Sequence, residues 1–116
     1  MANLILIIDD DPAVRSRLAT GFVTRGFRVE TAANGREALA LLEGERPALV
    51  LVDLEMPVMD GRSFARELSA RGLQLPLVLL SDEQEARGTA AEIGAAGYLS
   101  KPHAGPGRNG SSGQAV

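Results

Sequence analysis

The stretch ALVLVDLEMPVMDG, residues 48–61, joins an apolar run to a turn that begins with an aspartate. Its first five residues are apolar without alternation, which is typical of a strand covered on both faces. A strand of that kind belongs to a parallel sheet sandwiched between helices. Asp53 follows directly, at the point where the strand meets its loop. The stretch therefore predicts an α/β fold and an acidic group at one edge of its sheet.

Four further segments complete the predicted sheet, and the segments between the strands have apolar residues at helical spacing. The other strands are residues 4–8, 77–80 and 98–99, with the less apolar 28–32 suited to a sheet edge. The predicted helices run from 12 to about 25, from 35 to about 42, from 61 to about 71, and from 83 to 96. Strand and helix alternate throughout, which predicts a doubly wound sheet of five parallel strands with right-handed crossovers.

Two aspartates are interpreted as helix caps. Asp11 precedes Pro12, and a short polar residue before a first-turn proline is typical of a helix start, so Asp11 is left out of the candidate site. Asp60 is interpreted in the same way before Gly61. The last helix contains Gly88 and Gly94, each of which costs up to about 1 kcal/mol relative to alanine, so we expect it to be the least rigid.

Composition indicates one small domain that carries no disulfide. The chain has 116 residues, a formal net charge of -3 and no cysteine. We expect a cytoplasmic protein with no export signal and no membrane contact. We also expect no direct nucleic-acid partner, because its arginines are scattered rather than clustered. Residues 103–116 are rich in glycine and serine, which predicts a flexible tail after a domain formed by residues 1–102.

Polar groups gather where the predicted strands end. Asp9 and Asp10 follow the first strand, Asp53 and Ser81 follow two others, and Lys101 follows the last. The carboxyl ends of parallel strands share one edge, where α/β proteins bind ligands. Two carboxylates about 4 Å apart repel by on the order of 4 kcal/mol at an effective dielectric near 20. A divalent cation with oxygen ligands would compensate, which favours Mg²⁺ and an aspartate that accepts a phosphoryl group.

Four segments in this order resemble the receiver domains of response regulators in two-component signalling, a chemotaxis-regulator-like family. They are IIDDDP at 7–12, VDLEMPVMDG at 52–61, LS at 80–81 and YLSKP at 98–102. The resemblance covers residues 4–102 and implies a flavodoxin-like sheet of order 2-1-3-4-5. It also implies a phosphorelay switch that catalyses only its own phosphorylation and dephosphorylation, with a histidine kinase or phosphotransfer protein upstream and an unknown protein downstream.

The resemblance also implies a role for each site residue. Asp53 would be the phosphoacceptor, with Lys101 and Ser81 as its catalytic partners. The metal ligands would be Asp9, Asp10, Asp53 and the backbone carbonyl of Glu55. Ser81 and Tyr98 would be the switch residues, which change position on phosphorylation. The Lys101–Pro102 peptide bond is similar to one that is usually cis in the family.

The sequence departs from the family pattern in two places. Asp82 follows Ser81, where a small residue is usual, and we interpret it as a capping box with Glu85. The glycine-rich residues 103–116 do not suit the family's fifth helix, so we expect that helix to be missing and one sheet face to be partly bare. A bare apolar face indicates a truncated chain, lower stability or a homodimer.

The sequence leaves two other functions open. The chain could be a degenerate receiver that binds partners without being phosphorylated. It could also be a phosphatase of the haloacid-dehalogenase type, because Asp9 and Asp11 have the spacing of that family's nucleophile and second acid. The absence of a segment large enough to enclose a substrate argues against the phosphatase.

Overall fold

The computed structural model describes residues 3–81 and 83–101, except for the side chains of residues 83–87. Nine elements alternate along this part of the chain. They are β1 (Leu4–Ile8), α1 (Pro12–Thr24), β2 (Arg28–Ala32), α2 (Gly35–Leu41), β3 (Leu49–Asp53), α3 (Gly61–Ala70), β4 (Leu77–Ser81), α4 (Glu83–Ile93) and β5 (Gly97–Ser100). The strands form one parallel sheet of order β2-β1-β3-β4-β5, which confirms the predicted fold class.

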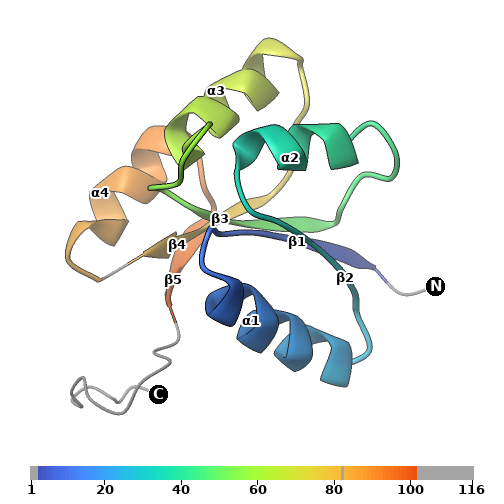
Figure 1. Ribbon diagram of the computed structural model, residues 1–116. Coiled ribbons are helices and arrows are strands. Elements are labelled where there is room, and N and C mark those ends of the chain that lie inside the picture. The colour runs from blue at the N-terminus through green and yellow to red at the C-terminus, as the bar shows by residue number, and fades with distance from the viewer. Residues whose placement is uncertain (1–2, 82, 102–116) are drawn as a thin grey trace.

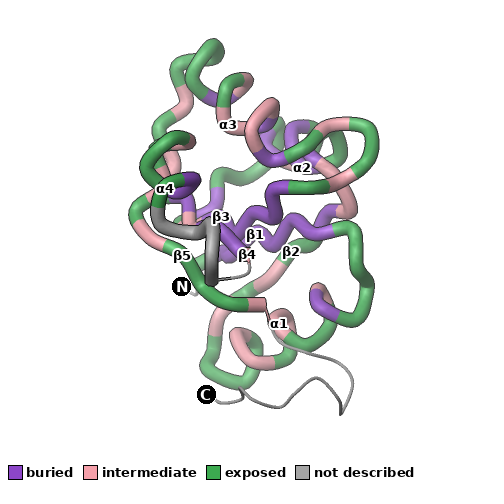
Figure 2. The backbone as a smooth tube through the Cα atoms, turned by 90° about the vertical axis from the view of Figure 1, so that its left-hand side faces the viewer, coloured by how far each residue is buried: buried purple, intermediate pink, exposed green. Residues whose placement is uncertain are grey.

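Helices cover the two faces of the sheet unequally (Figure 1). On one face α2, α3 and α4 enclose a core that includes Leu6, Val50 and Phe64. On the other face α1 packs on β1 and β2, over a smaller cluster around Ile7 and Leu51. The buried backbone lies mainly in the central strands (Figure 2). Burial on both faces explains why these strands are apolar throughout rather than alternating.

The sheet edges differ in their exposure. At one edge, β2 presents Arg28 and Glu30 to solvent, the charged pattern that discourages edge-to-edge pairing. At the other edge, Tyr98 and Leu99 of β5 are 37% and 44% exposed. Four helices lie within the described residues, whereas residues 103–116, to which the expectations of a missing fifth helix and a flexible tail apply, lie outside them.

Local sequence explains most helix ends. The Asp11 carboxylate accepts from the backbone N–H of Ala13, and that of Asp60 accepts from Ser63, so both predicted caps are confirmed. The prediction that the fourth helix reaches Ala96 is wrong, because α4 ends at Ile93. Gly94 adopts a φ of 76°, a left-handed conformation that glycine tolerates and that ends a helix.

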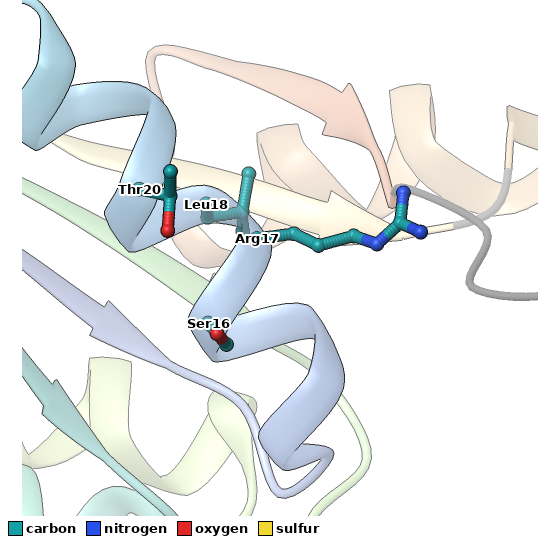
Figure 3. Close-up of a pocket in the computed structure, with 4 residues that line it drawn as sticks. All are labelled: Ser16, Arg17, Leu18 and Thr20. Atoms are coloured by element: carbon teal, nitrogen blue, oxygen red, sulfur yellow. The ribbon is translucent and has the colours of Figure 1, made fainter.

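A cavity of about 440 Å³ lies beside α1 and is lined by Ser16, Arg17, Leu18 and Thr20 (Figure 3). Arg17 extends away from the helix in this view. No helix within the described residues is long and apolar enough to cross a membrane.

Candidate functional site

Three strands deliver the charged residues of the site to one edge of the sheet. Asp9 follows β1, Asp53 is the last residue of β3, and Lys101 follows β5. The parallel register pairs Ile8 with Val52, so the residues that follow them, Asp9 and Asp53, emerge side by side. The predicted convergence at the carboxyl edge is therefore what the fold produces.

The ammonium of Lys101 lies between two carboxylates. Its Nζ is 2.9 Å from Oδ1 of Asp53 and 3.2 Å from Oδ2 of Asp9. The side chain of Asp9 is fully buried and that of Asp53 is 7% exposed, whereas Lys101 retains 27% exposure. Charges with so little water around them are screened weakly, so the attraction between Lys101 and these two carboxylates is stronger than the attraction in an exposed ion pair.

A third carboxylate completes an acidic cluster. One oxygen from each of Asp9, Asp10 and Asp53 lies within 4.8 Å of the other two, and Asp10 is the exposed member. Three acids face one lysine at this edge, so these four residues together leave an excess of negative charge. An exposed acid beside two buried ones forms a cluster that is open to solvent on one side.

Burial controls the acidity of Asp53. It raises the pKa of this carboxyl from 3.8 to about 6, and the charges of Asp9 and Asp10 act in the same direction. The hydrogen bond and charge of Lys101 oppose the shift without cancelling it. For Lys101, burial lowers the pKa, but the hydrogen bond of Asp53 and the charges of Asp53 and Asp9 outweigh it and leave the pKa raised. Lys101 therefore stays protonated, but its charge does not fully offset the cost of burying the ionised Asp53 carboxylate.

The acidic cluster suits a divalent cation. Oδ2 of Asp9 is buried and accepts no hydrogen bond of acceptable geometry from the described residues, although Lys101 lies nearby as an ion pair. A buried carboxylate oxygen in that state is costly unless an ion or water satisfies it. Mg²⁺ prefers carboxylate and carbonyl oxygens as ligands, and this cluster offers one oxygen from each of three carboxylates. The residues present fit the predicted metal.

The first turn of α1 organises Asp9 from two sides. Its Oδ1 accepts from the backbone N–H of Asp11 at 2.9 Å, and its backbone carbonyl accepts from Nη1 of Arg15 at 2.7 Å. Sequence reasoning missed Arg15. Its position, one turn after the cap residue Asp11, could have indicated this contact, because a long side chain there can reach back over the helix start. Asp11 itself is exposed and serves as the cap, as predicted.

The loop after Asp53 packs tightly against its neighbours. The backbone N–H of Gly61 donates to the carbonyl of Leu54 at 2.8 Å, and that of Gly35 donates to the carbonyl of Met59 at 2.9 Å. Val58 has a φ of 70°, and the Met59 N–H bonds back to the carbonyl of Pro57 at 2.7 Å. These features form a γ-turn centred on an exposed β-branched residue, a strained conformation held by the surrounding contacts. No local sequence pattern indicates this turn.

The remaining predicted residues lie on β4, on β5 and in the loop after β3. Ser81 ends β4, one residue beyond the partner of Asp53 in the register, and is half-buried. Tyr98 pairs with Leu79 inside the sheet and is partly exposed. Glu55 lies two residues after Asp53 and has an exposed side chain. The capping box of Asp82 and Glu85 and the Lys101–Pro102 bond lie outside the described residues.

Comparison with known proteins agrees with this geometry. Residues 5–106 match the response regulator receiver domain. The response regulator MprA of Mycolicibacterium vanbaalenii is 41% identical over 102 residues, which cover 86% of this chain and 44% of that protein, so the chain spans less than half the length of this curated relative.

Solved structures show the same fold. The chemotaxis response regulator CheY4 of Vibrio cholerae has a TM-score of 0.78 at 31% identity, with 89% of each chain covered. The response regulator TrrA of Thermotoga maritima, solved in complex with Mg²⁺ and BeF, has a TM-score of 0.76 at 30% identity, with 86% of this chain and 87% of that chain covered. The chain belongs to the family of response regulator receiver domains.

Proposed function

We propose that Asp53 accepts a phosphoryl group from a histidine kinase or phosphotransfer protein and that this change is read by a protein partner. The observation that carries the proposal is the position of Asp53, buried at a strand end with Lys101 at 2.9 Å and two further acids beside it. An isolated buried aspartate would be a structural liability. A buried aspartate that shares one cation with other acids is an arrangement suited to phosphoryl chemistry.

The transfer needs an ionised oxygen on Asp53. With a pKa of about 6 the carboxyl is mostly ionised at pH 7.5, and a bound cation would lower that pKa further. A carboxylate oxygen forms a bond to phosphorus while the phosphorus–nitrogen bond of a phosphohistidine breaks. The departing nitrogen keeps the electron pair of that bond. The product is an acyl phosphate on Asp53.

The acidic cluster would hold the metal through Asp10, Asp53 and Asp9, with Asp9 acting partly through water and Glu55 contributing its backbone carbonyl. Mg²⁺ in this position would neutralise charge on the phosphoryl oxygens during transfer. The chain's own contribution is to keep these carboxylates converged and to hold the Lys101 ammonium against Oδ1 of Asp53.

Phosphorylation replaces the single negative charge of the Asp53 carboxylate with the charge of about -1.5 to -2 of a phosphoryl group, which brings three strong acceptor oxygens. The Lys101 ammonium can pair with one of these oxygens, and the Ser81 hydroxyl can donate to another after a shift of the loop that follows β4. We expect Tyr98 and α4 to follow that shift. Within α4, Thr89 and Ala90 are the buried residues among those with described side chains, and Ile93 packs against the core beside them, so these are the contacts that a movement of the helix would have to rearrange.

The chain catalyses only its own phosphorylation and dephosphorylation in this proposal. Its domain comprises residues 1–102, and its location is cytoplasmic, where a histidine kinase can reach it. A homodimer through the sheet face beside α1 is a further proposal, because Leu99 at that end of the sheet is 44% exposed.

The test uses acetyl phosphate as a small-molecule phosphodonor, with Mg²⁺, followed by intact-protein mass measurement. We expect one added phosphoryl group on the wild type and none on Asp53→Asn. Asp11→Asn is the matched control, since it neutralises an exposed acid that follows Asp10 directly but is not part of the cluster, and asparagine retains the cap.

Beryllofluoride with Mg²⁺ separates this function from the degenerate receiver. Binding that depends on Asp53 supports the phosphoacceptor. An intact fold with neither labelling nor beryllofluoride binding would leave the inert interaction module as the better account.

A further inference from the structure

A groove runs along the seam between α3 and α4. Two cavities of about 440 Å³ each lie there, and they share four lining residues, so they form one continuous depression. The shared residues are Ala65, Ser69, Ile93 and Gly94. Each cavity falls within the roughly 300–1,000 Å³ typical of ligand sites. Figure 1 shows the two helices side by side on the same face of the sheet.

Small residues keep this seam open. On α3, Ala65 and Ser69 are one turn apart and face the groove, and Gly94 lies at the end of α4. A larger side chain at any of these positions would fill the space between the helices. The depression therefore results from the small side chains along the seam.

The two ends of the groove differ in chemistry. One end is lined by Arg62 and Arg66 together with Glu92. The other end is lined by Leu73, Leu75 and other apolar or uncharged residues at the start of β4. The lining residues thus carry two positive charges and one negative charge, in a chain whose formal net charge is -3. The groove is a locally cationic site joined to an apolar one.

The arginines at the charged end remain accessible. Arg62 binds Glu92 through Nε at 3.1 Å and Nη2 at 3.2 Å, with side chains 42% and 57% exposed. Arg66 is exposed, and its Nη2 donates to Oγ of Ser63 at 3.2 Å. An incoming carboxylate can replace the neutral Ser63 acceptor with a charged one, which forms a stronger hydrogen bond.

The two ends of the groove differ in their distance from the acidic cluster. The charged end begins at Arg62, next to Gly61, which packs against the backbone of Asp53. The apolar end is at Pro76 and Leu77, where β4 begins, whereas Asp53 is at the opposite, carboxyl edge. Apolar residues of a ligand at that end would not contact a metal or a phosphoryl group at the acidic cluster. The whole ligand would contact α3, which starts beside Asp53, and α4 together.

We propose that the α3–α4 groove binds a peptide segment of a partner protein that carries an acidic residue followed by large apolar residues. The acidic residue pairs with Arg66, and the apolar residues cover Leu73, Leu75 and Ile93. The lining of the groove runs from Arg62 to Gly72, along α3 and just beyond it, which is a length of about 15 Å at about 1.5 Å per residue. An extended peptide of about five residues spans that length.

The test uses a panel of fluorescein-labelled peptides that contain two glutamates, a spacer of one to four glycines, and two leucines followed by phenylalanine. Binding to the unphosphorylated full chain is measured by fluorescence polarisation, and the site is mapped by amide chemical shifts. Matched peptides replace the glutamates by lysines or the apolar residues by serines. We expect at least one acidic peptide to bind, with shifts at Ala65, Ser69 and Ile93, and both replacements to weaken it at least fivefold.

Two variants and a control locate the site. Arg66→Glu reverses a lining charge and is expected to weaken binding about tenfold, and Ser69→Trp fills the groove and is expected to abolish it. Arg36→Glu makes the same charge change on α2, away from the groove, and is expected to leave affinity within twofold. Circular dichroism confirms that each variant is folded.

Three outcomes would overturn the proposal. They are no binding by any peptide at millimolar concentration, shifts confined to other elements, and equal effects of Arg36→Glu and Arg66→Glu. The assay involves neither Mg²⁺ nor phosphorylation, so its failure is independent of the phosphoacceptor role of Asp53.

Discussion

A Cβ atom on Gly61 would lie 2.3 Å from the backbone carbonyl oxygen of Asp53. Real Cβ atoms essentially never come that close to backbone, so the start of α3 can sit against the end of β3 only because residue 61 has no side chain. The glycine thus fixes where α3 begins relative to Asp53. Any larger residue must move either the helix or the end of β3.

This contact predicts the effect of Gly61→Ala. We expect the variant to lose about 1 to 3 kcal/mol of unfolding free energy through overpacking, and to be phosphorylated more slowly because Asp53 is displaced. Urea denaturation and acetyl phosphate labelling measure the two effects.

Gly21→Ala is the matched control for that substitution. A Cβ on Gly21 meets nothing within 4 Å, and the residue lies inside α1, so alanine there is expected to stabilise the protein by up to about 1 kcal/mol. Equal stability of Gly61→Ala and the wild type would contradict the packing argument.

The raised pKa of Asp53 predicts how stability changes with pH in metal-free protein. The carboxyl has a pKa of about 6 when folded against 3.8 ordinarily, so its contribution to stability is fully present below pH 4 and is lost as pH rises through 6. The uncharged amide of an asparagine side chain imitates the protonated carboxyl. Asp53→Asn should therefore equal the wild type near pH 4 and exceed it by up to about 3 kcal/mol at pH 7.5.

Urea unfolding across pH 4 to 8 in a chelating buffer checks this difference. Adding Mg²⁺ should then stabilise the wild type more than Asp53→Asn, because the variant has lost a ligand of the acidic cluster. A wild type that is more stable than the variant at pH 7.5 without metal would contradict the assigned direction of the pKa shift.

The shared ion pair predicts that Lys101→Met makes stability depend strongly on metal. Removing the ammonium leaves the fully buried Asp9 and the nearly buried Asp53 without their cation, which should cost about 2 to 4 kcal/mol at pH 7.5. Mg²⁺ should restore most of that loss. Thermal unfolding with chelator and with Mg²⁺ measures both quantities.

Arg71→Met provides the comparison for an exposed pair. Arg71 binds Glu67 one turn away at 3.2 Å, with side chains 45% and 39% exposed, so its loss should cost no more than about 1 kcal/mol and should not respond to Mg²⁺. A Lys101→Met variant that behaves like Arg71→Met would show that the buried acids are compensated by other groups.

The sequence predicted the sheet and the position of its acids because both follow from short-range patterns. Apolar runs marked each strand, and the residue after each run marked the carboxyl edge, which placed Asp9 and Asp53 together. The features that it did not predict have different causes. The contact of Arg15 with the carbonyl of Asp9 is local, and the position of Arg15 one turn after Asp11 could have indicated it. The γ-turn at Val58 is also local, but its strained backbone has no characteristic sequence pattern. The groove beside Ser69 depends on how α3 and α4 pack, which no local pattern encodes.

Alanine substitution should have opposite effects on stability at Gly88, inside α4, and at Gly94, just after its end. Gly88 lies inside the helix with open space around it, so Gly88→Ala should stabilise the protein by about 0.5 to 1 kcal/mol and slow amide exchange in α4. Gly94 also has open space, but its φ of 76° is strained for any other residue, so Gly94→Ala should destabilise by about 1 kcal/mol. Because the two sites differ in backbone conformation and not in room, equal effects would refute the assignment of Gly94 as the helix stop. If α4 moves when Asp53 is phosphorylated, Gly88→Ala should also weaken beryllofluoride binding, since a more rigid helix opposes the change.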